Sequence, residues 1–154
     1  MTQSFIPGID GSQGISSFEL SPCKKYLAVC EKAPQAICVV YELKTLKQKR
    51  VLTSSEIGAT EYVGLSFARS EKDKLQQYLC TLTNRCSDGQ FRLVVWLWEK
   101  SRLVTAQIVR LDLGGATPDS IPLHCSFHPE DPKILLLTGK NMYRYYKLNS
   151  NMQL

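Results

Sequence analysis

Hydrophobic and polar residues alternate along most of the chain in short runs, and turn-forming residues separate one run from the next. Such alternation is typical of β-strands that bury one face, and helical spacing is nearly absent. Three stretches share one order of features: an alternating run ends in a large hydrophobic residue, a polar turn follows, and a second apolar run begins. They are FELSPCKKYLAVC at 18–30, LSFARSEKDKLQQYLCTL at 65–82 and CSFHPEDPKILLL at 125–137. The chain therefore repeats one unit.

Each of these stretches is followed by another turn and then by an aromatic-rich run, which we expect to be a third strand. These runs are AICVVYEL at 36–43, FRLVVWLWE at 91–99 and MYRYYKL at 142–148. Further apolar runs at 49–53 and 102–109 follow the first two, and SFIPG at 4–8 is expected to end a corresponding run before the first unit. Two kinds of marker keep their order in every unit. They are the strand-end residues Leu20, Phe67 and Phe127, and the structural aromatic positions Tyr41, Trp98 and Tyr146.

Turn signals complete the unit, since Asp88-Gly89 and Gly139-Lys140-Asn141 each separate a second run from a third. A repeat of about 45 residues with four antiparallel strands is the period of a propeller blade. The prediction is an all-β incomplete β-propeller over residues 1–154 with about three four-stranded units, two of them full blades and one three-stranded. The expected units are 3–43, 49–99 and 102–148. Closed rings have about four to eight blades, so closure needs the remaining blades of a longer chain or another subunit.

The ends of the aromatic runs and two of the turns resemble WD repeats. The family strand ends in alternating apolar residues followed by Trp-Asp, and its first two blade strands are joined by a Ser-Pro or His-Pro turn. This chain lacks the family's Gly-His pair and replaces its Asp by Glu or Lys, so the usual polar network of a blade is not expected here. The matching segments are Val39-Val40-Tyr41-Glu42, Trp96-Leu97-Trp98-Glu99, Tyr145-Tyr146-Lys147, Ser21-Pro22 and His128-Pro129.

A narrower resemblance covers most of residues 5–111. The segments FIPG, KKYLAV, LKTLKQKRVLTSSEIGATEYVGLSF and VVWLWEKSRL are similar to the first propeller of the cilia- and flagella-associated WD-repeat proteins. Proteins of that kind carry two propellers and a long coiled coil, and no heptad segment is visible here. The resemblance thus implies a fragment or short form of such a protein.

The function that this resemblance implies is a non-catalytic scaffold of the ciliary or flagellar axoneme that helps to dock or assemble inner dynein arms. Its expected partners are inner dynein arm components and tubulin. The alternative from the repeat pattern alone is a general cytoplasmic or nuclear WD-repeat interaction scaffold unrelated to cilia.

Composition narrows the class of protein. Hydrophobic residues make up 44% of the chain and charged residues 21%, values of a soluble globular protein, and no apolar run is long enough to span a bilayer. The six cysteines lie mostly in apolar runs without Cys-x2-Cys spacing, which favours a reduced cytoplasmic location without a metal site or cofactor. A net charge of +5 is too modest to identify a partner by itself.

One stretch could carry catalysis, because LHCSFHPEDPKILLLTG at 123–139 holds Cys125 and both histidines of the chain. A thiol hydrolase or transferase that uses Cys125 and His128 is therefore an alternative of a different class. The alternation instead places Leu123, Cys125 and Phe127 on a buried face, away from His124, and makes His128-Pro129 the start of a turn. We accordingly expect no catalytic residue.

Two further clusters are candidates for partner contact. Lys44, Lys47, Lys49 and Arg50 concentrate positive charge on or beside a surface hairpin, where they could bind acidic partners such as tubulin tails. The alternative is a solvated outer strand whose lysines discourage edge pairing. No aromatic residues are interleaved with these charges, which disfavours nucleic-acid binding. An aromatic binding surface of Trp96, Trp98 and nearby tyrosines is the second candidate, against which strand alternation favours core packing.

Overall fold

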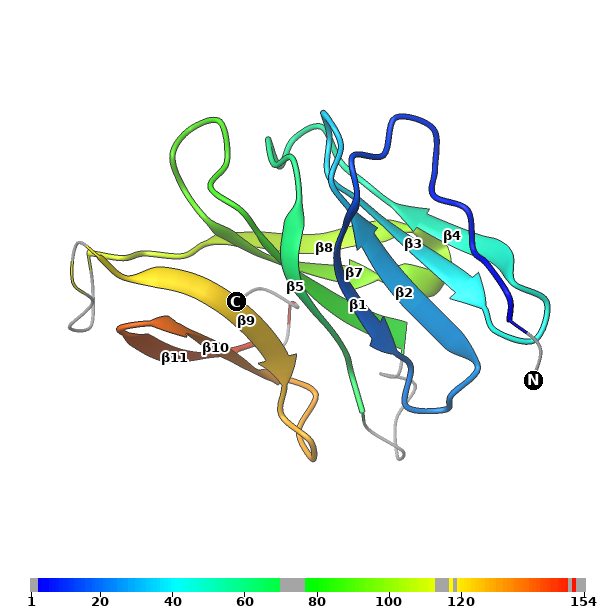
Figure 1. The fold of residues 1–154 in the computed structure, drawn as a ribbon. Coiled ribbons are helices and arrows are strands. Elements are labelled where there is room, and N and C mark those ends of the chain that lie inside the picture. Colours follow the sequence, from blue (N-terminus) through cyan, green and yellow to red (C-terminus); the bar gives the residue numbers. More distant parts are fainter. Residues whose placement is uncertain (1–2, 70–76, 113–116, 118, 150, 152–154) are drawn as a thin grey trace.

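The computed structural model describes residues 3–69, 77–112, 117, 119–149 and 151, which form three antiparallel sheets side by side (Figure 1). The first sheet contains β1 (Ile15–Leu20), β2 (Tyr26–Glu31), β3 (Ile37–Glu42) and β4 (Lys47–Leu52). The second contains β5 (Tyr62–Phe67), β6 (Tyr78–Thr83), β7 (Arg92–Leu97) and β8 (Arg102–Ile108). The third contains β9 (Ile121–Phe127), β10 (Ile134–Lys140) and β11 (Met142–Lys147). The predicted all-β fold with two four-stranded blades and one three-stranded blade is confirmed.

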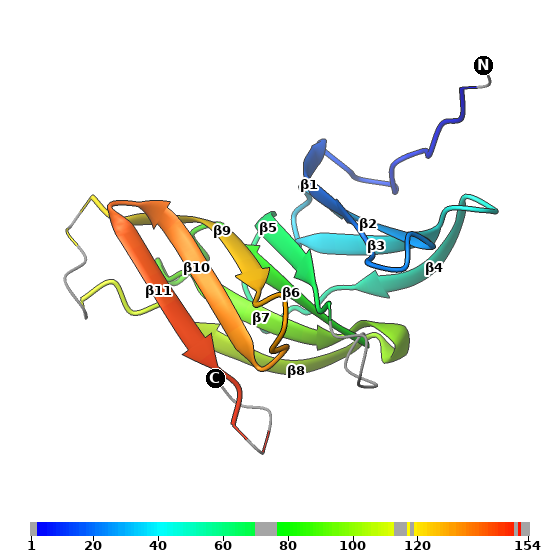
Figure 2. The same ribbon diagram turned by 90° about the horizontal axis from the view of Figure 1, so that it is seen from below.

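Strands pair in sequence order within every sheet, as consecutive hairpins require. Both hairpin signals are confirmed as turns, and Gly89 and Asn141 adopt the positive φ angles of 80° and 52° that tight turns require. The first strands β1, β5 and β9 lie next to one another, so the sheets fan out from this inner side (Figure 2). The division into sequence units 3–43, 49–99 and 102–148 stays a prediction. The unit 49–99 begins within β4, the outer strand of the first sheet, and the unit 102–148 begins at the start of β8, the outer strand of the second sheet.

The predicted strand-end residues Leu20, Phe67 and Phe127 are the last residues of β1, β5 and β9. Each of these strands carries a β-bulge four residues before its end, because the register skips one residue there. The skipped residues are Ser16, Val63 and Leu123.

The bulge corrects one prediction about the third sheet. Leu123 was expected on the buried face with Cys125, but its side chain is 56% exposed and Pro122 is buried instead. An extra residue in a strand shifts the alternation of its side chains by one position, which sequence alternation alone does not reveal. Gly139 lies opposite, where a Cβ atom would be 1.9 Å from the carbonyl oxygen of Ile121.

Strand register also corrects the equivalence of the aromatic positions. Tyr41 pairs with Leu27 and Tyr146 with Leu135, and the matching pair in the second sheet is Trp96 with Leu79. Trp96 is therefore the equivalent residue, whereas Trp98 lies beyond β7 in the short 3-10 helix η2 (Trp98–Lys100). The segment SFIPG at 4–8 is not a strand either, because it pairs with no strand among the described residues.

Two hydrophobic cores fill the spaces between the sheets. We call the side of a sheet that is turned toward the next sheet in sequence its forward face, and the opposite side its backward face. The forward face of the first sheet is built from small residues, Ala28, Cys30, Cys38 and Val40. The backward face of the second sheet is built from large ones, mainly Leu65, Phe67, Leu79, Trp96 and the adjacent Trp98. Small side chains on one face let bulky side chains on the other approach closely, as dense packing requires.

Polar groups at the ends of the inner strands link the sheets in a repeated way. The Glu19 carboxylate accepts the backbone N–H of Phe67 at 2.7 Å, and the Ser66 hydroxyl accepts the backbone N–H of Phe127 at 3.3 Å. Glu19 and Ser66 each precede the last residue of their strand, and Ser126 holds this position in the third sheet. Burial raises the pKa of Glu19, against the opposing effects of the Phe67 N–H and of Arg69, whose guanidinium lies 3.5 Å from the carboxylate.

Trp98→Ala is expected to lower the free energy of unfolding by about 3–5 kcal/mol, because it empties space in the core between the first two sheets. The indole is 4% exposed and makes edge-to-face contacts with Tyr26 and Phe67 at ring-centre distances of 5.0 and 5.9 Å. Urea denaturation measures the change. The matched control Tyr143→Ala, at an exposed position, is expected to change stability by about 0.5 kcal/mol or less. Equal effects of the two variants would contradict the assignment of Trp98 to the core.

Glu19→Gln is expected to change how stability depends on pH. The carboxyl group holds its proton more tightly in the folded chain, so the folded state binds more protons than the unfolded state as pH rises from the ordinary value of 4.5. Between pH 4.5 and the raised pKa of the folded state, the contribution of Glu19 to the free energy of unfolding therefore falls, by at most about 1.4 kcal/mol per pH unit. The variant should lack this decrease in urea denaturation at a series of pH values. An unchanged slope would show that other groups cause it.

Candidate interaction surfaces

In the segment with Cys125 and both histidines, Cys125 lies in a core and His128 in a turn. Cys125 is fully buried, and its Sγ lies 3.7 Å from Sγ of Cys80 across the core between the second and third sheets. His128 Nδ1 accepts the backbone N–H groups of Glu130 and Asp131 at 3.2 and 3.1 Å. This histidine therefore caps the turn that it opens, as predicted, and its Nδ1 is not available to a thiol.

The thiol environment also differs from that of a reactive cysteine. Burial raises the pKa of Cys80 well above its ordinary value, with its neighbour Cys125 acting in the same direction. A nucleophilic cysteine needs the opposite shift, because the thiolate is the reactive form. Among the described residues, no three His, Cys, Asp or Glu side chains are grouped so that they could hold a metal ion.

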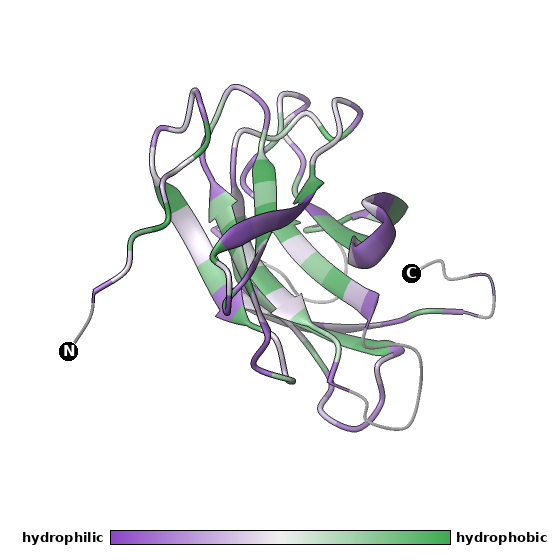
Figure 3. Cartoon of the chain, turned by 90° about the vertical axis from the view of Figure 1, so that its right-hand side faces the viewer, coloured by the Kyte–Doolittle hydropathy of each residue, from purple (hydrophilic) through white to green (hydrophobic). Residues whose placement is uncertain are grey.

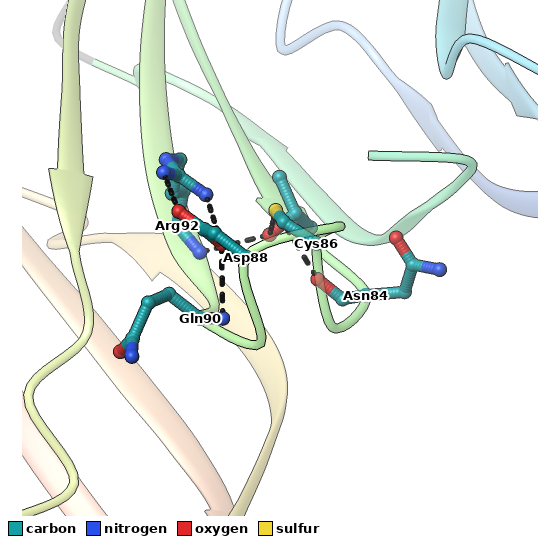
Figure 4. A network of polar contacts seen from close by, with 6 residues as sticks. Asn84, Cys86, Asp88, Gln90 and Arg92 are labelled. Atoms are coloured by element: carbon teal, nitrogen blue, oxygen red, sulfur yellow. Dashed lines mark hydrogen bonds and ion pairs between the residues drawn. The ribbon is translucent and has the colours of Figure 1, made fainter. Parts of the chain in front are cut away.

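The β6–β7 hairpin contains a network of polar contacts (Figure 4). Asp88 forms an ion pair with Arg92 and accepts the backbone N–H of Gln90 at 3.1 Å. The hydrogen bond from Arg92 lowers the pKa of Asp88 to about 2. Cys86 donates to the Asn84 carbonyl oxygen at 3.7 Å. These contacts are local to the turn, and they fix its shape.

The predicted basic cluster lies on the turn after β3 and on β4. In Figure 3, β4 is the strand that is mostly purple, the colour of hydrophilic residues. Lys44, Lys47, Lys49 and Arg50 are all exposed, but they do not share one role. Arg50 Nε donates to the carbonyl oxygen of Glu99 in η2 at 2.6 Å. The arginine thus links the first two sheets, and the lysines are left to face solvent.

The structure adds two lysines to this cluster. The backbone N–H of Leu43 donates to the carbonyl oxygen of Lys25 at 2.9 Å, so the β1–β2 turn lies beside the β3–β4 turn. Lys24 and Lys25 are exposed on that turn. Sequence reasoning missed them because the KK pair lies far from KTLKQKR along the chain. We call Lys24, Lys25, Lys44, Lys47 and Lys49 the basic surface.

The aromatic residues separate into buried and exposed groups. Tyr41 and Trp98 are buried, Tyr146 is half-buried, and Trp96 donates from Nε1 to Thr81 Oγ1 at 3.0 Å inside the core. Core packing, which the alternation favoured over a binding surface, therefore describes both tryptophans. Tyr143 and Tyr145 are instead each 68% exposed. Alternation along MYRYYKL places them on the face opposite Tyr146, and this was the signal that could have identified them.

Tyr143 and Tyr145 border a groove of about 400 Å³ between the third sheet and the end of β8. Tyrosine and arginine are frequent at the centres of protein interfaces, since both combine apolar area with polar groups. The groove is lined by Gln107, Ile108, Arg110, Tyr143, Arg144 and Tyr145.

The N-terminal segment, residues 3–14, covers part of the backward face of the first sheet. Ile6 and Ile9 pack on the cluster of Val29, Val39 and Tyr41. The backbone N–H of Ile9 donates at 3.3 Å to the carboxylate of Glu31, which is buried. A groove of about 760 Å³ runs between this segment and the sheet.

No helix in the described part of the chain has the length and apolar character that a membrane span requires.

Comparison with known proteins identifies the fold. No protein-family model matches the chain. The β-propeller domain of Cps50 (Swd1) from Myceliophteria thermophila superposes with a TM-score of 0.59 and 13% identity, covering 92% of this chain and 40% of that domain. The WD40 repeats of RRP9 give a TM-score of 0.56 at 10% identity, covering 90% of this chain and 39% of that one.

Curated relatives give a more specific similarity. The chain is 28% identical over 146 residues to cilia- and flagella-associated protein 57 of Mus musculus, covering 92% of this chain and 10% of the mouse protein. It is 22% identical to cilia- and flagella-associated protein 57 A of Tetrahymena thermophila, covering 98% of this chain and 14% of that protein. The chain thus spans a tenth to a seventh of these relatives. It has the WD-repeat β-propeller fold, and nearly its whole length is similar to a stretch of cilia- and flagella-associated protein 57.

Proposed function

We propose that this chain is a sector of an interaction scaffold in the axoneme of cilia or flagella, where it helps to dock or assemble inner dynein arms. The observation that carries the proposal is the similarity to cilia- and flagella-associated proteins over 92% of the chain. The dynein arm role rests on the sequence resemblance, and inner dynein arm components are the expected partners.

The arrangement of the surface supports a scaffold rather than an enzyme. Three rigid sheets hold their connecting turns in fixed positions, and rigidly held loops are where binding residues concentrate. The basic surface lies on two such adjacent turns, and the groove beside Tyr143 and Tyr145 lies on another side of the molecule. Separate contact surfaces on one rigid body are what a protein needs to hold two partners together.

Tubulin is the acidic partner that we propose for the basic surface. Clustered exposed lysines attract anionic chains through long-range electrostatics, and such attraction weakens with salt. Lys44, Lys47 and Lys49 form no ion pair with the described acidic side chains, so their charge faces outward. Arg50 is left out of the basic surface because it holds the Glu99 carbonyl group.

A fluorescently tagged chain expressed in ciliated cells tests the location. The expected signal follows the axoneme and remains after detergent removes the ciliary membrane and soluble matrix. A uniform cytoplasmic or nuclear signal would contradict the ciliary proposal and favour the alternative, a general WD-repeat scaffold unrelated to cilia. A tagged chain with the destabilising substitution Trp98→Ala is the control for a folded docking surface.

Charge reversal tests the tubulin contact. Lys44→Glu/Lys47→Glu/Lys49→Glu should weaken co-sedimentation with purified microtubules by about tenfold or more, equivalent to at least about 1.4 kcal/mol. Removal of the acidic tubulin tails with subtilisin should weaken binding of the unmodified chain to a similar degree. The matched control Lys32→Glu/Lys133→Glu/Lys140→Glu makes the same charge change at exposed lysines outside the basic surface, two between strands and one at the end of β10. Equal loss in both variants would show a general charge effect and exclude the basic surface as the site.

A further inference from the structure

Among the described residues, two sheet faces pack against no other sheet, although residues 3–14 cover part of one of them. They are the two kinds of face that pack against each other elsewhere in the molecule. The forward face of the third sheet carries Tyr143 and Tyr145, each 68% exposed. The backward face of the first sheet carries Phe18, which is 71% exposed, and Leu20, which is 43% exposed. In the two interior contacts, the equivalent faces bury cores with hardly any exposure.

Strand register shows which residues correspond between the interior contacts and the open faces. Cys80 of β6 pairs with Val95 of β7, and Leu136 of β10 pairs with Tyr145 of β11 at the equivalent register. Cys80 of the second sheet therefore corresponds to Leu136 of the third. Cys125 corresponds to Phe18, because each lies two residues before the end of an inner strand. Since Cys80 and Cys125 touch across an interior contact, Leu136 and Phe18 are the matching pair on the open faces.

The hydrogen bonds between inner strands are also ready to continue. Glu19 and Ser66 each accept a backbone N–H from the last residue of the next inner strand. Ser126 holds the equivalent position in the third sheet, and its hydroxyl forms no hydrogen bond with another described residue. Leu20 is the matching donor residue. The backbone N–H of Ser21 donates to the carbonyl oxygen of Tyr26 in β2, so the N–H of the preceding residue, Leu20, points away from β2 and lies on the open edge of β1.

We propose that the forward face of the third sheet binds the backward face of the first sheet of a second copy of this chain, after residues 3–14 have moved off that face. Ser126 Oγ then accepts the N–H of Leu20 from the second copy, and Leu136 packs against its Phe18. The contact continues the interior sheet-to-sheet packing across two molecules.

The N-terminal segment controls this contact because it occupies the same place. Ile6 and Ile9 cover the β2–β3 part of the backward face, and the groove of about 760 Å³ beneath them has room for larger side chains once the segment leaves. Tyr143 and Tyr145 take the positions that Cys38 and Val40 hold in the first sheet, and their rings need this additional space.

The contact is head-to-tail, so each added copy leaves one open face of each kind. Head-to-tail contacts produce a closed ring where the rotation between copies closes and an open filament where it does not. The segment 3–14 therefore acts as a cap that limits assembly of the free chain.

Disulfide trapping tests the geometry. One copy carries Phe18→Cys and the other Leu136→Cys, both with Cys23→Ser, since Cys23 is the exposed native cysteine. Both also carry Ile6→Asp/Ile9→Asp, which places charge against the apolar face and Glu31 and so releases the cap. Oxidation of an equal mixture with diamide should give a covalent heterodimer, because the equivalent native sulfurs lie 3.7 Å apart. The yield should exceed by about tenfold that of a control in which Gln90→Cys, on an exposed turn, replaces Leu136→Cys.

Sedimentation velocity gives an independent readout without cysteines. The full chain with Ile6→Asp/Ile9→Asp should associate at concentrations where the unmodified chain stays monomeric, and adding Tyr143→Lys/Tyr145→Lys should return it to a monomer. Circular dichroism confirms that each variant keeps its sheets, and Ile6→Ser/Ile9→Ser serves if the aspartate variant does not fold. Equal cross-linking in the Gln90→Cys control, or association that survives both lysine substitutions, would overturn the proposal. A cap-released chain that stays monomeric would overturn it as well.

Discussion

The packing of one sheet face on the next is the interaction on which the rest of the structure depends. Among the described residues no helix layer covers the sheets, so the two large hydrophobic cores lie where one sheet packs on the next. This constraint explains why small residues such as Ala28, Cys38 and Val40 lie opposite Trp96 and Trp98. It also explains the five buried cysteines, which serve as small apolar side chains in a tight core.

The inner strands repeat three local devices that position one sheet on the next. A bulge four residues before each strand end shifts the alternation of side chains by one position. A large hydrophobic residue ends each strand. In the first two sheets, the polar side chain just before it accepts a backbone N–H from the following sheet. The Ser16 hydroxyl, at the first bulge, also donates to the Tyr62 carbonyl oxygen at 2.8 Å. Because the devices repeat, the last sheet carries an acceptor and the first sheet a donor that match each other.

Three groups that could take part in chemistry are instead held in structural contacts. His128 holds a turn, Cys125 is closed in a core, and Asp88 is paired with Arg92. The exposed lysines, the exposed tyrosines and the capped backward face are each positioned by the rigid sheets behind them. Such a distribution suits a protein whose role is to hold other proteins in place.

Sequence alone determined the class of the strands and their order within the three blades, because a strand with one buried face needs alternating side chains and a turn needs its own residue types. The repeat of these local patterns was sufficient to predict two four-stranded blades and one three-stranded blade. The strand ends at Leu20, Phe67 and Phe127 followed from the same signal.

Only the tertiary structure decided the features that depend on residues far apart in sequence. The bulge at Leu123 is set by register against β10, and the correspondence of Trp96 with Tyr41 is set by pairing with β6 and β2. Lys25 joins the basic surface through a hydrogen bond between two turns, and residues 3–14 lie on the first sheet instead of forming a strand. Alternation records which side of its own strand a residue occupies, whereas register and packing arise from the partner strand, which the local pattern does not contain.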